Sequence, residues 1–165
     1  MKKLALFAIF VFAWSFGATP ASVSAQNWQE IEPLRSKCVD IKRIFKVEDC
    51  SLPTTRLEFP TYNIKINFKR PSDYWNVSND TVVGVTIIFK DLMKLRDYEN
   101  DFSDYVIKPE SDAPEITIYK NSKKGIELSV QTPPIVTEPY IYDIVLTPSE
   151  KNARKYKCTP RPKCK

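Results

Sequence analysis

Alternating hydrophobic and polar residues mark much of the chain as β-strand. In residues 64–69 every even position is apolar and every odd position is polar, which gives a strand one dry face. Residues 82–89 carry apolar side chains on both faces, as a central strand does. The pattern predicts five or six strands, drawn from residues 55–59, 64–69, 82–89, 115–120, 125–131 and 140–147.

A helical repeat precedes these strands. Cys38, Ile41 and Phe45 recur at helical spacing and predict a helix over residues 37–46, with Ser36 as its N-cap. So short a helix is stable only when it packs against a broader element. The sequence therefore predicts an α+β fold, in which the N-terminal helix packs in two layers on a mostly antiparallel sheet.

Two segments between the strands are less regular. Residues 91–97 are expected to form one or two helical turns, because Leu92 and Leu95 are spaced as on one helix face. The three prolines within residues 132–139 favour an extended loop.

Residues 1–25 have the layout of a secretory signal peptide. Two lysines precede an apolar run over residues 4–16, and small residues at 23–25 precede a cut ahead of Gln26. The apolar run is shorter than the roughly 20 residues that a membrane-spanning helix needs. We therefore expect residues 26–150 to form a single domain that is secreted or periplasmic, with no transmembrane segment after the signal is removed.

The chain has four cysteines, an even number that in an exported protein predicts disulfide bonds. Three pairings are possible, and we favour Cys38–Cys50 with Cys158–Cys164 because each pair closes a short loop. Free buried thiols are the alternative. Zinc is disfavoured, since the chain has no Cys-x-x-Cys motif and no histidine.

The absence of histidine excludes the usual Ser-His-Asp and Cys-His catalytic sites and histidine metal clusters. An enzyme would have to use carboxylates, and Asp143 is the acid most apt to point inward. The alternative for Asp143 is a charge near a strand edge that prevents the edge from pairing with another strand. No catalytic, cofactor-binding or metal-binding residue is predicted.

One acidic stretch resembles the start of a calcium-binding loop. It lacks the glycine that turns such a loop and the glutamate that closes it, so a solvated polar surface is the preferred interpretation. Its members are Asp97, Glu99, Asp101 and Asp104.

Basic residues concentrate at the C-terminal end. The whole chain has a formal net charge of +5, while residues 151–165 hold seven basic residues and no acid. Such a segment attracts anionic polymers and lipid headgroups in a salt-dependent way. Nucleic acid is disfavoured outside the cytoplasm, and a disulfide-clipped, solubilising tail is the alternative. The predicted contacts with an anionic surface are Arg154, Lys155, Lys157, Arg161 and Lys163.

Several large aromatic residues are candidates for a partner-binding surface, because tyrosine and tryptophan are enriched at interfaces. Placement in the core is the alternative for each of them. The candidates are Trp28, Trp75, Tyr140 and Tyr142.

Short matches to known proteins are scattered over most of the chain. They are Trp28, Ile31, Pro33, Leu34, Ser36, Cys38, Asp40, Ile41, Ile44, Trp75, Asn76, Val77, Asp80, Thr81, Val82, Tyr119, Asn121, Gly125, Ile126, Pro148 and Cys158. Together these residues resemble a family of small exported bacterial proteins of unknown function. The start of the chain is also similar to outer-membrane assembly lipoproteins of the SmpA/OmlA type and to beta-lactamase-inhibitor-like domains. Both of these groups are noncatalytic helix-plus-sheet modules that bind proteins.

Two departures limit what the resemblance implies. Val47 stands where those groups usually end the helix with glycine, and Gln26 stands where a lipid anchor would need cysteine. A lipid anchor and an assembly role are therefore not expected.

We expect an exported, noncatalytic binding or interaction domain, without a cofactor, whose partner is an unidentified protein or an anionic envelope component. The alternatives are a carboxylate-dependent hydrolase acting on cell-wall polysaccharide and a packed structural component of the envelope.

Overall fold

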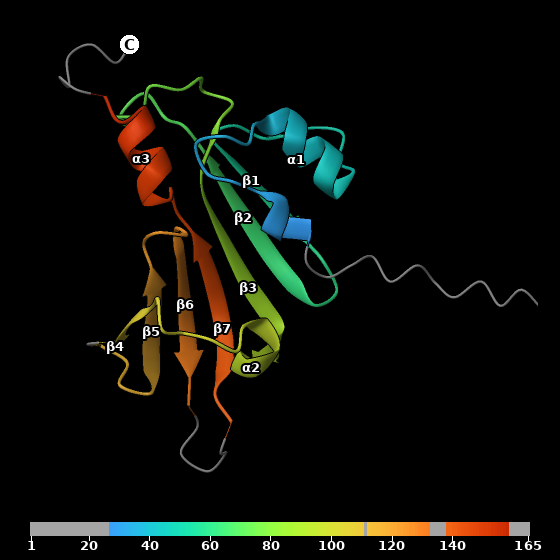
Figure 1. Cartoon of the computed structure of the whole chain (residues 1–165). Helices are drawn as coiled ribbons and strands as arrows, with labels where there is room; N and C mark the ends of the chain where they lie inside the picture. The colour runs from blue at the N-terminus through green and yellow to red at the C-terminus, as the bar shows by residue number, and fades with distance from the viewer. Residues whose placement is uncertain (1–26, 111, 133–137, 159–165) are drawn as a thin grey trace, which may run out of the picture.

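The computed structural model describes residues 27–110, 112–132 and 138–158. Seven strands form one open, fully antiparallel sheet in the order β1-β2-β3-β7-β6-β5-β4 (Figure 1). The strands are β1 (Thr54–Glu58), β2 (Tyr62–Phe68), β3 (Val82–Lys94), β4 (Val106–Pro109), β5 (Ile116–Asn121), β6 (Ile126–Gln131) and β7 (Tyr140–Leu146). The helices are η1 (Asn27–Glu30), α1 (Cys38–Phe45), α2 (Leu95–Tyr98) and α3 (Glu150–Tyr156).

The α+β class is confirmed, but the expected strand number is wrong because the sheet has seven strands. The additional strand is β4, at the edge of the sheet beside β5. All four residues of β4 are exposed, so the segment has no alternation of buried and exposed positions that a sequence pattern could reveal.

One face of the sheet, the inner face, carries the hydrophobic core. Ile64, Ile87, Ile144 and Leu128 lie opposite one another on β2, β3, β7 and β6, and all four are buried. Burying each such side chain stabilises the fold by about 1.5–3 kcal/mol. The helical segments η1 and α1 lie on this side of the sheet (Figure 1) and add buried side chains to the same core.

The N-terminus of α1 differs from the prediction. Ser36 does not cap the helix, because its hydroxyl accepts a hydrogen bond from Glu32 N at 2.8 Å. The helix instead begins after Lys37, whose backbone N–H donates to Asp40 Oδ2 at 2.8 Å. Ser36 therefore stabilises the turn that leads into α1.

A long irregularity interrupts the pairing of β3 with β7. Ile88 pairs with Asp143, and the next pair along the two strands is Met93 with Ile141. The strand β3 continues through residues 89–94, so the helical turns expected at 91–97 are confined to α2.

The predicted disulfide Cys38–Cys50 is confirmed, with 6.0 Å between the two Cα atoms. It joins the start of α1 to the segment that precedes β1. The other predicted pairing, Cys158–Cys164, involves Cys164, which lies outside the described residues. Among the described helices, none has the length and apolar character required to cross a membrane.

Residues 150–156 form the helix α3, which takes up the first part of residues 151–165, the segment expected to be a basic tail. The backbone N–H of Asn152 donates to the N-cap Ser149 Oγ at 3.4 Å. The buried Asn152 side chain donates to Glu32 Oε1 at 2.9 Å and to Pro33 O at 3.3 Å. These bonds join α3 to the segment between η1 and α1.

Candidate basic groove at helix α3

The turn between β5 and β6 approaches α3 very closely. Gly125 has a φ of 75°, and a Cβ on it would lie 2.8 Å from Ser149 N and closer still to Thr147 O. The N–H of Glu150, the first residue of α3, donates to Ser122 O at 3.1 Å. Glycine is required here for both its backbone conformation and its size.

Asn121 fixes the shape of the same turn. Its side chain is buried, and its Oδ1 accepts from the Lys124 N–H at 3.0 Å, while Gly125 N donates to Asn121 O at 2.8 Å. An asparagine side chain that bonds its own turn is a common way to fix loop geometry. Asn121 and Gly125 thereby set the positions of the two lysines between them.

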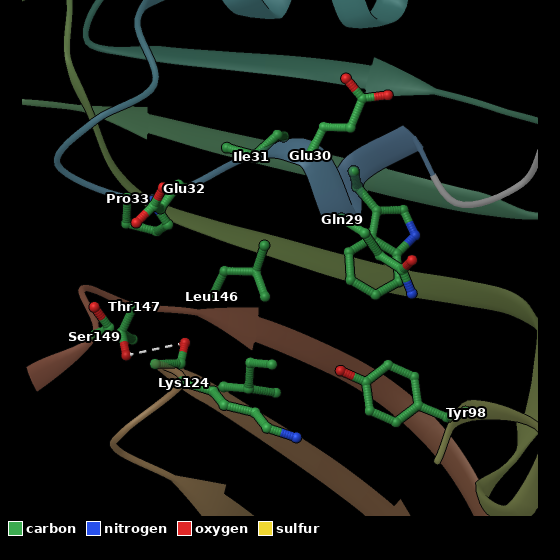
Figure 2. A pocket seen from close by; sticks show the side chains of 13 residues that line it. Gln29, Glu30, Ile31, Glu32, Pro33, Tyr98, Lys124, Leu146, Thr147 and Ser149 are labelled. Carbon is green, nitrogen blue, oxygen red and sulfur yellow. Dashed lines mark hydrogen bonds between the residues drawn. The ribbon is translucent and has the colours of Figure 1, made fainter.

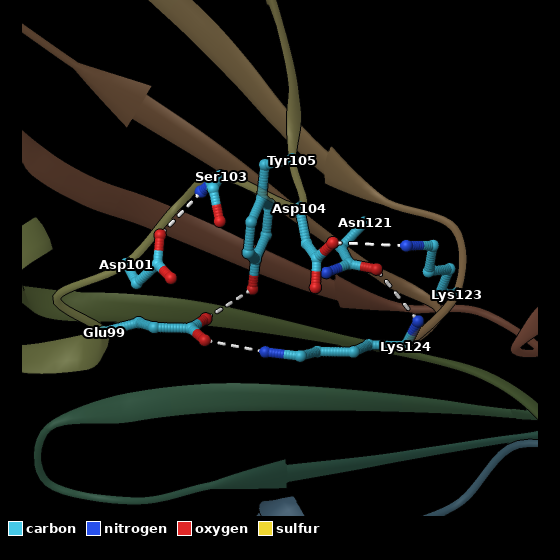
Figure 3. Close-up of polar contacts among 8 residues, drawn as sticks. All are labelled: Glu99, Asp101, Ser103, Asp104, Tyr105, Asn121, Lys123 and Lys124. Atoms are coloured by element: carbon cyan, nitrogen blue, oxygen red, sulfur yellow. Dashed lines mark hydrogen bonds and ion pairs between the residues drawn. The ribbon is translucent and has the colours of Figure 1, made fainter.

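Two acids beside the turn hold those lysines, as Figure 3 shows. Lys123 Nζ lies 3.2 Å from Asp104 Oδ1, and Lys124 Nζ lies 2.6 Å from Glu99 Oε1. Tyr105 donates its hydroxyl to Glu99 Oε2 at 2.7 Å. Burial alone would raise the pKa of Glu99, but the hydrogen bonds from Lys124 and Tyr105 outweigh it and lower the pKa.

The acidic residues considered for a calcium site therefore make other contacts. Glu99 and Asp104 pair with lysines, and Asp101 Oδ1 accepts from the Ser103 N–H at 2.9 Å. In the described ranges there is no group of three or more side chains suited to hold a metal ion.

Lys123 and α3 together line an open groove of about 610 Å³, which we call the basic groove. Four of its lining residues are cationic and one is acidic, and Arg154 NH2 lies 3.6 Å from the acid, Glu150. The lining residues are Lys123, Glu150, Lys151, Arg154 and Lys155. Lys123 is also paired with Asp104, so the excess of positive charge in this solvent-accessible depression comes from Lys151 and Lys155. Such an excess suits an anionic ligand.

An aromatic pair lies at the C-terminal end of α3. Residues 74–76 run antiparallel to residues 156–158: Asn76 N donates to Tyr156 O at 2.8 Å, and Cys158 N donates to Tyr74 O at 3.0 Å. This pairing places Trp75 opposite Lys157. Tyr74 is 52% exposed.

The structure brings some of the predicted binding residues together. Arg154 and Lys155 lie on α3, and Lys157 follows it directly beside Trp75, so the candidate anionic-surface contacts and one candidate partner residue form a single region. Arg161 and Lys163 lie outside the described residues. Lys123 was not predicted, because it lies in a turn 27 residues before the start of α3 and no local pattern signals their contact.

The proposed aromatic surface is not one patch. Trp28 is only 1% exposed and belongs to the core, so its assignment to a partner surface is wrong. Tyr140 and Tyr142 lie at the start of β7, whereas α3 follows the end of that strand. Of these two, Tyr142 is exposed and Tyr140 is half-buried.

Asp143 does not point into the core. β7 has one extra residue, Tyr142, between the pairs Asp143–Ser129 and Ile141–Val130, so Ile141 and Ile144 both face inward. Asp143 therefore lies on the outer face of the sheet, which is the face directed away from η1 and α1. Burial raises its pKa, a hydrogen bond from Ser129 opposes the shift, and the charge of Glu127 adds to it.

Comparison of the chain with family models, with curated proteins and with solved structures finds no match.

Proposed function

We propose that the protein is an exported, noncatalytic binding domain whose basic groove holds an anionic component of the cell envelope. The observation that supports this proposal is the groove itself, where four cationic side chains and one acid line a solvent-accessible depression. Ligands of this class include the headgroups of anionic phospholipids, which attract a lysine or arginine near the surface with about 1 kcal/mol each.

The surroundings of the groove favour the same class of partner. Tyr74 and Trp75 lie beside Lys157, and aromatic rings with one wet edge suit the boundary between headgroups and hydrocarbon. The groove is open and formed by flexible side chains, which suits a surface or polymer better than a buried small substrate.

The test compares the purified full chain with a variant that lacks three groove cations, Lys151→Gln/Arg154→Gln/Lys155→Gln. Binding to vesicles of phosphatidylglycerol and phosphatidylcholine is measured by co-sedimentation. Removing three cations should cost about 3 kcal/mol, which corresponds to an affinity loss on the order of 100-fold.

A matched control removes three exposed cations from strands outside the groove, Arg56→Gln/Lys65→Gln/Lys108→Gln. It has the same net charge as the groove variant, and we expect it to bind within about threefold of the unaltered protein, because distant exposed charges are screened. Equal losses in both variants would show that net charge alone drives binding and would refute a groove-specific role. No loss in the groove variant would refute it as well.

A further inference from the structure

A second cleft, of about 520 Å³, lies on the inner face between η1 and Tyr98 of α2 (Figure 2). Leu146 of β7 and Ile126 of β6 form its floor, and Ile31 and Pro33 extend the apolar lining toward α1. A volume of several hundred cubic ångström is typical of sites for small molecules, which are apolar clefts with a few polar groups. The basic groove shares none of these lining residues.

The charged groups of this cleft are already paired. Glu30 Oε2 lies 3.3 Å from Arg43, Glu32 Oε2 lies 2.7 Å from Arg35, and Lys124 Nζ lies 2.6 Å from Glu99. A charged ligand would lose hydration on entry without gaining a free counter-charge. The cleft therefore selects against ions of either sign.

A neutral polar group, the Tyr98 hydroxyl, belongs to the cleft wall. Figure 2 shows the Tyr98 hydroxyl directed into the cleft. Burial and then the charge of Glu99 raise the pKa of Tyr98 to about 12, so the hydroxyl stays protonated at neutral pH.

Two aromatic rings of the cleft lining stack on each other. The rings of Trp28 and Tyr98 are inclined by 9°, with centroids 6.4 Å apart. Because Trp28 is only 1% exposed, this stacked pair closes one side of the cleft as a packed apolar wall.

We propose that this cleft binds an uncharged, mainly apolar small molecule that carries a hydrogen-bonding group. This inference does not depend on the proposed function of the basic groove, since the two sites use different residues.

The test uses two fluorescent probes with the same ring system, uncharged N-phenyl-1-naphthylamine and its sulfonate, 1-anilinonaphthalene-8-sulfonate. The full chain carries Trp14→Phe and Trp75→Phe, so that Trp28 is its one tryptophan. We expect saturable 1:1 binding of the uncharged probe, with a Kd on the order of 10 μM and energy transfer from Trp28. The sulfonate should bind at least about tenfold more weakly.

The variant Ile126→Glu places a charge in the floor and should weaken binding of the uncharged probe by at least about tenfold. Its matched control, Ile88→Glu, makes the same exchange at an exposed position of the outer face and should leave binding unchanged. If Ile126→Glu does not fold, as judged by circular dichroism, then Ile126→Ala against Ile88→Ala serves instead, with an expected loss of about tenfold.

Three results would overturn the proposal. They are the absence of saturable binding, equal affinity for the sulfonate, and a loss at residue 88 as large as the loss at residue 126. The vesicle experiment on the groove variants is unaffected by any of these results, so the two proposals can fail separately.

Discussion

At the scale of single residues, Gly125 has the most demanding position in the chain, because its backbone is left-handed and it touches the residues before α3. We expect Gly125→Ala to lower the free energy of unfolding by about 2–4 kcal/mol, from backbone strain and steric overlap together. Urea denaturation followed by circular dichroism measures this change.

Gly84→Ala is the matched control. A Cβ on Gly84 would meet only Leu146 O at 3.5 Å, an ordinary contact, and its φ lies outside the left-handed region. We expect this exchange in β3 to change stability by less than about 1 kcal/mol, since alanine is not disfavoured in a strand relative to glycine. Equal losses at both positions would contradict the account of the β5–β6 turn.

Asp143 makes a pH-dependent contribution to the free energy of unfolding. Its sign is opposite to that of a paired carboxylate. Burial raises its pKa, so the folded state keeps the proton to higher pH than the unfolded chain does. Below the unfolded pKa both states are protonated and there is no effect. As the pH rises through the folded pKa, the buried charge lowers stability.

Asp143→Asn should therefore raise the urea midpoint at pH 7, and this gain should disappear at pH 3. Asp91→Asn, at an exposed position of β3, should change stability by less than about 0.5 kcal/mol at either pH. A gain from Asp143→Asn that is equal at both pH values would show that the carboxyl charge is not its cause.

At the scale of secondary-structure elements, α3 depends on one buried side chain. Asn152 donates to Glu32 Oε1 and Pro33 O, and its loss would leave the buried Pro33 carbonyl without this bond. We expect Asn152→Ala to cost about 1–3 kcal/mol and to increase hydrogen exchange of the α3 amides before the rest of the chain opens. Ala153→Ser, at the neighbouring and less buried position of the helix, should not produce this local opening.

Most strands could be predicted because each forms a local period-2 pattern. The predicted 64–69 and 125–131 segments match β2 and β6 to within two residues at each end. The pattern failed where burial is decided by other parts of the chain. The four exposed residues of β4 give no signal, and the extra residue Tyr142 reverses which face Asp143 occupies.

The candidate site was predictable only in part. The basic composition of residues 151–165 indicated an anionic ligand, but the positions of Lys123 and Trp75 beside α3 depend on contacts far apart in sequence. Trp28 shows the same limit, because the sequence does not reveal whether an aromatic side chain is exposed or lies in the core. The assignment of such a residue requires the packed structure.

At the scale of the whole molecule, the two proposed sites depend on different parts of the fold. The cleft is built on the inner face by β6, β7, η1 and α2, whereas the basic groove joins α3 to one turn at the end of that sheet. Loss of α3 packing should therefore weaken binding at the groove more than binding in the cleft. The disulfide Cys38–Cys50 stabilises the part of the molecule that contains α1.

The expected export of the chain connects this disulfide to the compartment in which the protein folds. A disulfide that closes a loop of this size stabilises the folded state by about 3 kcal/mol, and it persists only in an oxidising compartment. If residues 1–25 direct export, then deletion of residues 2–25 should leave the chain in the cytoplasm with Cys38 and Cys50 reduced. The full-length chain expressed in the same cells should be cut ahead of Gln26 and carry the disulfide.

Maleimide labelling of intact cells, quenched in acid, followed by mass analysis of the peptides that contain Cys38 and Cys50, measures the difference. Cys38→Ser/Cys50→Ser is the control for stability, since it removes the bond in either compartment and should lower the unfolding free energy by the same about 3 kcal/mol. Equal labelling of the full-length and shortened chains would contradict export through residues 1–25. Because the groove cations need no disulfide, the double variant should still bind anionic vesicles at temperatures where it remains folded.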